Sequence, residues 1–158
     1  MSVIFDGLSL GAIYALIALG YTMVYGIAKM LNFAHGDIIM VGAYAVFTTL
    51  AAGGNLAIGV LTSVIVCTLM GIIIEKVAYR PLRGVTPIAV LITAIGVSYL
   101  LQSIAQLIFG AKAQSVSLPS LGAVSIAGTN VSVSSILTMG ISAVIMIALT
   151  LFLSLIHI

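Results

Sequence analysis

Long apolar stretches, separated by short polar segments, organise this chain. No Asp, Glu, Lys or Arg occurs at positions 7–28, 38–74 or 84–111. Such stretches are typical of helices surrounded by hydrocarbon, because about 20 apolar residues are needed to cross a core about 30 Å thick. The pattern therefore predicts membrane-spanning helices rather than the core of a water-soluble domain.

The apolar stretches predict five spans, at about residues 7–27, 38–52, 56–78, 87–109 and 134–156. Their lengths favour helices over the strands of a membrane barrel, which are about 10 residues long and alternate in polarity.

The second of these spans is short. It reaches only about 22 Å at about 1.5 Å per residue. Either neighbouring helices shelter it, or it begins earlier, near Phe33. An earlier start would bring His35 and Asp37 to the edge of the membrane.

A different pattern occupies residues 124–133, where apolar and small polar residues alternate around Gly128, Thr129 and Asn130. This pattern is typical of a short β-hairpin. The predicted fold class is therefore all-α: a polytopic transmembrane helix bundle of about five spans with a small extracytoplasmic β-hairpin, forming a single membrane domain over residues 1–158. Gly7, Gly11 and Ala15, four residues apart, predict a face on which another helix packs closely.

The distribution of positive charge predicts the orientation. Lys76, Arg80 and Arg83 follow the third span, Lys29 follows the first, and Lys112 alone lies between the fourth and fifth. Because cytoplasmic loops carry the excess of Lys and Arg, we expect the 76–83 segment to be a cytoplasmic loop and the N-terminus to lie outside.

Composition narrows the function classes. The chain is 63% hydrophobic and 5% charged, against about 25% charged residues in ordinary soluble domains. Its net charge is only +2, and its positively charged residues form no continuous basic surface along the sequence, so nucleic acid is not an expected partner. No phosphate-binding loop or metal-ligand spacing is present. The residues thus indicate no catalytic, cofactor-binding or metal site, and we do not expect an enzyme.

The densest polar cluster comprises Asn32, His35 and Asp37. One interpretation is that these groups line a pathway or brace a bend, since ionisable groups at membrane depth are usually functional. The other is that Asn32 or Asp37 caps the second helix while His35 lies at the interface. The sequence leaves both open.

Two further sets of polar residues are candidates. The first is the cationic set, which could contact a cytoplasmic partner, anchor the chain at the membrane surface, or do both: Lys76, Arg80 and Arg83. The second lies near one face of the fourth span and could form interhelical hydrogen bonds, worth about 0.6 kcal/mol each, or face water: Thr93, Ser98, Gln102 and Gln106.

Four segments resemble, in order, the permeases of branched-chain amino acid ABC transporters of the LivH type. Residues 7–27 resemble the family's first helix, and Asn-Phe-Ala-His-Gly-Asp at 32–37 its next hallmark. Residues 75–83 are similar to its cytoplasmic loop, and 91–98 to the start of the following helix.

The resemblance implies a membrane-spanning subunit of an ATP-driven importer in the bacterial inner membrane. It implies that an extracytoplasmic binding protein delivers an aliphatic amino acid, that two homologous permease subunits form the pathway within the lipid, and that two cytoplasmic ATPase subunits hydrolyse ATP. Two alternatives stay open. The first is a secondary transporter or channel, although the chain has no convincing internal repeat of the kind common in such transporters. The second is an accessory membrane protein that binds another helix bundle.

The chain departs from the family in length. Permeases of this kind are nearly twice as long and continue into a basic cytoplasmic segment with a coupling helix, whereas no Lys or Arg follows Lys112 here. We therefore expect a truncated reading frame that lacks the main ATPase contact.

Overall fold

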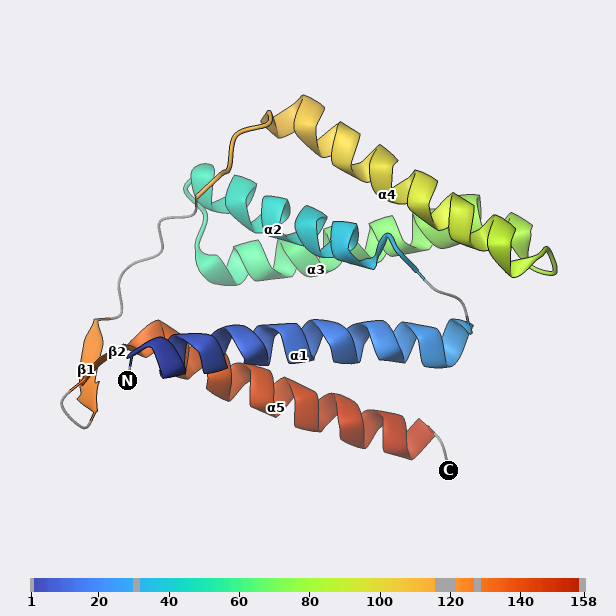
Figure 1. The fold of residues 1–158 in the computed structure, drawn as a ribbon. Coiled ribbons are helices and arrows are strands. Elements are labelled where there is room, and N and C mark those ends of the chain that lie inside the picture. The colour runs from blue at the N-terminus through green and yellow to red at the C-terminus, as the bar shows by residue number, and fades with distance from the viewer. Residues whose placement is uncertain (1, 30–31, 116–121, 127–128, 157–158) are drawn as a thin grey trace. The chain divides into compact units, whose positions relative to one another are not determined.

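The computed structural model describes residues 2–29, 32–115, 122–126 and 129–156. The helices and strands are shown in Figure 1 and have the following bounds: α1 Ser2–Ala28, α2 His35–Ala51, α3 Leu56–Ile74, the π-helical turn η1 Glu75–Tyr79, the 3-10 turn η2 Arg80–Leu82, α4 Pro87–Phe109, β1 Ala123–Ile126, β2 Thr129–Ser132 and α5 Val133–Ile156.

The prediction of a mainly helical chain is confirmed. Four segments of the described chain are long and apolar enough to cross a membrane: Val3–Gly26, Leu56–Leu82, Pro87–Phe109 and Val133–Leu155. The helix α2 is a shorter apolar helix of 17 residues. It begins at His35, so of the two options for the second span the earlier start is the one observed.

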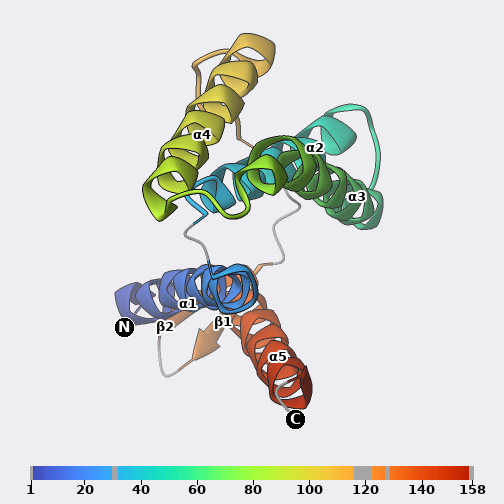
Figure 2. The ribbon, with the colours of Figure 1, turned by 90° about the vertical axis from the view of Figure 1, so that its right-hand side faces the viewer.

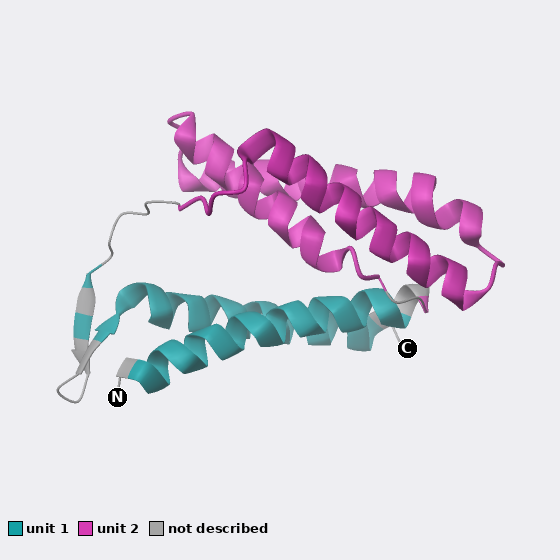
Figure 3. Cartoon of the chain, turned by 45° about the horizontal axis from the view of Figure 1, so that its top comes forward, with its two compact units in different colours: residues 1–28, 118–158 teal, residues 29–117 magenta. Residues whose placement is uncertain are grey.

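The chain divides into two compact units, coloured separately in Figure 3. Unit 1 comprises Met1–Ala28 and Leu118–Ile158, and unit 2 comprises Lys29–Ser117.

In unit 1, α1 and α5 lie side by side (Figure 1). Each helix buries a small polar residue, Ser9 on α1 and Ser142 on α5. The predicted packing face of α1 is exposed instead: within the described residues, a Cβ added at Gly7 or Gly11 would meet no atom within 4 Å. Within this unit α5 therefore packs on another face of α1.

The two strands of unit 1 pair antiparallel, with Val124 opposite Val131 and Ile126 opposite Thr129. The predicted turn was misplaced, because Thr129 and Asn130 belong to β2; Gly128 lies outside the described residues. Thr and Val favour strands, and Val131 is buried where β2 meets α1 and α5.

In unit 2, α2 and α3 pack closely along their length (Figure 2). Gly42 permits this approach, because a Cβ there would lie 2.8 Å from the Cys67 sulfur. The thiol of Cys67 donates to the carbonyl oxygen of Ile38 across the same seam at 3.4 Å. The predicted turn between the helices is present: Gly53 has a φ of +84°, and the side chain of Asn55 caps α3 by accepting from the amide of Ile58 at 2.9 Å.

The segment predicted as a cytoplasmic loop at 75–83 is helical almost throughout, which corrects that part of the prediction. The helix α3 continues through η1 and η2 to Leu82. Glu, Lys, Ala and Arg are good helix formers, so nothing local stops the helix before Pro81, which lacks an amide hydrogen. The reversal toward α4 occurs at Gly84, whose φ is +92°.

The core of unit 2 lies where the start of α2, the end of α3 and the first two-thirds of α4 meet. The buried apolar residues of this cluster are Ala34, Ile74, Tyr79, Val90, Ala94 and Leu101. The polar side chains described next lie around this core.

Candidate functional site

The segment that leads into α2 is tied to the end of α3 through one side chain. The Oδ1 atom of Asn32 accepts a hydrogen bond from the amide of Ala34 at 3.1 Å and another from the hydroxyl of Tyr79 at 2.6 Å. The first bond is the local Asx turn that Asn readily forms. The second joins residues 47 positions apart in the chain, and so fixes the start of α2 against the turn η1.

Neither Asn32 nor Asp37 occupies the N-cap position of α2. That position belongs to Ala34, and no side chain caps it. Asp37 instead lies in the first helical turn, where the positive end of the helix dipole favours a carboxylate. His35, the first residue of the helix, is partly exposed.

Asp37 is joined to α4. Its side chain is 7% exposed, and its Oδ1 atom accepts a hydrogen bond from the Nε2 atom of Gln102 at 3.0 Å. The same nitrogen also donates to the hydroxyl of Ser98, one turn earlier on α4, at 3.2 Å. Because burial of a polar group without a partner is costly, Gln102 is the residue that makes the buried position of Asp37 tolerable.

The remaining predicted interhelical residues are not brought into this network. Thr93 is half-buried and Gln106 is exposed, and neither has a side-chain hydrogen bond within the part of the chain that the structure describes. Of the four residues predicted on this face of α4, the structure thus brings only Ser98 and Gln102 together.

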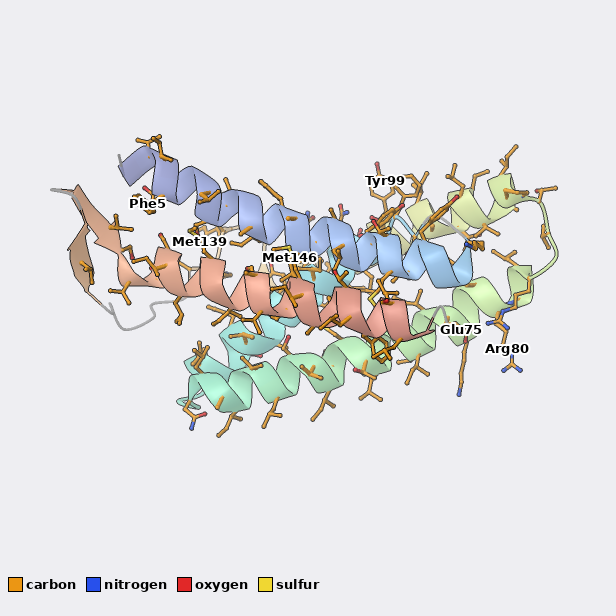
Figure 4. The ribbon with its side chains drawn as sticks, turned by 90° about the horizontal axis from the view of Figure 1, so that it is seen from below. Phe5, Glu75, Arg80, Tyr99, Met139 and Met146 are labelled. Atoms are coloured by element: carbon orange, nitrogen blue, oxygen red, sulfur yellow. The ribbon has the colours of Figure 1, made fainter. Side chains whose placement is uncertain are left out.

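The cationic residues divide into two kinds. Lys76 and Arg80 are exposed, and Figure 4 shows Arg80 extending away from the helix. Arg83 forms an ion pair with Glu75, with 2.6 Å between Nη2 and Oε1. Both partners are well exposed, so the pair contributes about 0–1 kcal/mol. Lys76 and Arg80 are the cations more available to a partner.

Sequence reasoning missed two members of this arrangement, Tyr79 and Glu75. A signal existed for each. A tyrosine beside a predicted span often buries its ring while its hydroxyl finds a partner, and Glu75 is the sole acidic residue among the nearby cations.

An apolar cavity of about 290 Å³ lies between α2, α3 and α4, and Val41 and Leu101 are among its lining residues. Tyr44 stacks on Phe109 at its wall, with 4.1 Å between ring centroids, and Phe47 meets the Phe109 ring edge-on. Among the described lining residues none is charged. The cavity therefore suits an aliphatic group and offers no ion pair to an ammonium or carboxylate group.

Comparison with known proteins gives consistent matches. The family described as "Branched-chain amino acid transport system / permease component" matches residues 3–157. The chain is 42% identical over 163 residues to the high-affinity branched-chain amino acid transport system permease protein BraD of Pseudomonas aeruginosa, covering 94% of this chain and 53% of BraD.

It is also 44% identical over 126 residues to the corresponding LivH proteins of Salmonella typhimurium and Escherichia coli, covering 74% of this chain and 40% of each relative. The chain thus spans about half the length of the curated relatives it matches. No solved structure matches it significantly.

The hydrogen bond between Gln102 and Asp37 should contribute measurably to stability. Replacing Gln102 with Leu leaves the buried carboxylate without its partner, which should lower the free energy of unfolding by about 1–3 kcal/mol. Gln106→Leu, one turn further along α4 and exposed, is the matched control and should have little effect. The measurement is unfolding of the chain in mixed micelles, followed by circular dichroism.

The double variant Asp37→Leu with Gln102→Leu completes the test. Replacing both partners with apolar groups should recover much of the lost stability. Equal losses for Gln102→Leu and Gln106→Leu, or a double variant no more stable than Gln102→Leu, would contradict the assigned pairing.

Proposed function

We propose that this chain, which belongs to the family of branched-chain amino acid transport system permease components, forms part of the translocation pathway of an ATP-driven importer of aliphatic amino acids. The observation that carries the proposal is the family match over residues 3–157, made on a chain with several apolar membrane-spanning helices. The two compact units would together form one membrane domain in the bacterial inner membrane.

The proposed partners follow from the role of a permease component. A second, homologous permease would complete the pathway. An extracytoplasmic binding protein would deliver the amino acid, and two cytoplasmic ATPase subunits would hydrolyse ATP and drive the change of access. ATP chemistry would then lie on separate subunits.

The proposed orientation places the basic turn after α3 in the cytoplasm, with the N-terminus and the hairpin of β1 and β2 outside. The charge distribution supports it. The bond between Asn32 and Tyr79 supports it further, because it keeps the segment after Lys29 at the same end of unit 2 as Lys76 and Arg80. Together with the four longer helices, α2 would bring the number of spans to five. Its 17 residues measure about 25 Å, and α3 and α4 would shelter its ends.

The polar residues would then have separate roles. Asn32 and Asp37 would brace the start of α2, because each is hydrogen-bonded to another element, while His35, at the helix start and partly exposed, would face the pathway. Lys76 and Arg80 would contact the cytoplasmic partner or anchor the turn in anionic lipid, and Arg83 would contribute less because Glu75 already pairs with it.

Deletion of the gene that encodes this chain should abolish high-affinity uptake of radiolabelled leucine, isoleucine or valine by intact cells. Uptake of a chemically unrelated amino acid, such as lysine, is the control and should be unchanged. Returning the gene to the deletion strain should restore uptake, and this uptake should require ATP and the binding protein. Uptake in membrane vesicles driven by an ion gradient alone would instead favour a secondary transporter.

The orientation is tested by single cysteines introduced into a Cys67→Ser background. A cysteine replacing Lys76 should react with a membrane-impermeant maleimide only in inside-out vesicles, because that turn is proposed to be cytoplasmic. A cysteine replacing Lys112, between α4 and β1, should react in intact spheroplasts. Reaction of the position-76 cysteine from outside the cell would overturn the topology without touching the family assignment.

A further inference from the structure

The side chains that are buried at the end of α3 and in the turn after it have an unusual spacing. Ile74 and Tyr79 are 6% and 8% exposed and belong to the same buried cluster, although they are five residues apart. Val77, between them, is 73% exposed. Five residues is the hydrogen-bond spacing of a π-helix, and the amide of Arg80 indeed donates to the carbonyl oxygen of Glu75, five residues earlier.

An ordinary α-helix would bury different residues here. Each residue turns about 100° around an α-helix, so Tyr79 would lie about 140° from Ile74 and face away from the core. Val77 would lie within about 60° of Ile74 and face the core, beside Ala78, which packs against the core in the observed structure as well. The observed π register thus buries the ring of Tyr79, whereas an α register would bury the side chain of Val77.

A hydrogen bond of Tyr79 distinguishes the two registers. In the π register the hydroxyl of Tyr79 donates to Asn32 at 2.6 Å, and turning Tyr79 outward would break that bond. The reversal that follows, with Gly84 at a φ of +92°, gives the chain a flexible residue at which a change of register could be absorbed before α4.

We propose that residues 75–82 form a two-register switch, held in the π register by the hydrogen bond between Tyr79 and Asn32. Loss of that bond converts the segment to the α register, with Val77 turned inward. Arg80 would then move around the axis of α3 by about 100°, which is the rotation of one residue in an α-helix. That this movement of Arg80 changes its contact with a cytoplasmic partner rests on the proposed function, whereas the change of register does not.

The switch can be measured on native side chains by methyl NMR. The chain, with labelled Val and Ile methyl groups, is placed in bicelles that contain a lipid with gadolinium in its headgroup. Paramagnetic broadening then reports exposure near the membrane surface. The internal references are Val90, which is 6% exposed, and Val85, which is 49% exposed.

In the wild-type chain the Val77 methyl signals should broaden strongly, as those of Val85 do. In Tyr79→Phe, and separately in Asn32→Leu, the broadening at Val77 should be lost and should approach that of Val90. Tyr99→Phe is the matched control, because Tyr99 is 67% exposed, and it should leave Val77 as in the wild type.

A change of register and a simple loosening of the segment predict opposite changes in the broadening of the Val77 methyl signals. If Tyr79 merely stabilises the segment, its replacement will increase broadening at Ile74, Val77 and Val90 together, and that result would overturn the proposal. Unchanged broadening at Val77 in both variants would overturn it as well. The experiment contains no partner protein, so failure of the transport proposal cannot be mistaken for failure of the switch.

Discussion

Polar groups inside a hydrocarbon layer must find hydrogen-bond partners within the protein, and this requirement governs how the helices pack. Backbone groups meet it by forming helices. In unit 2 the buried Asp37 meets it by pairing with Gln102, and at the end of the helices Asn32 pairs with Tyr79. Apolar packing alone distinguishes poorly between one helix orientation and another in lipid, because lipid tails are as apolar as the side chains. The polar pairs therefore select how α2, α3 and α4 meet.

Much of the helical architecture could be predicted from the sequence. The bounds of α4 are those expected from the apolar stretch that begins at Pro87 and ends before Gly110, and α5 differs by one residue at its start. What local sequence could not give was the course of the chain after α3. There the helix continues in a different register, because Tyr79 is held by a residue 47 positions earlier. No local propensity contains that information.

In the candidate site, too, the sequence predicted which residues are polar and in apolar surroundings but not which of them pair. The residue types marked Asp37 and Gln102 as polar groups in apolar surroundings, and interhelical bonding was among the expected roles of Gln102. Which residue it would meet could not be predicted, because the partner depends on the rotation of α4 about its own axis. Gln106, four residues further along α4, was an equal candidate by sequence and is exposed.

In a membrane, the buried hydrogen bond between Asp37 and Gln102 should join α2 to α4. Solid-state NMR in lipid bilayers tests it most directly, through the dipolar coupling between the side-chain nitrogen of Gln102 and the carboxyl carbon of Asp37. We expect a clear coupling, because the two groups are directly hydrogen-bonded. Absence of that coupling in a chain whose helices are intact would contradict it.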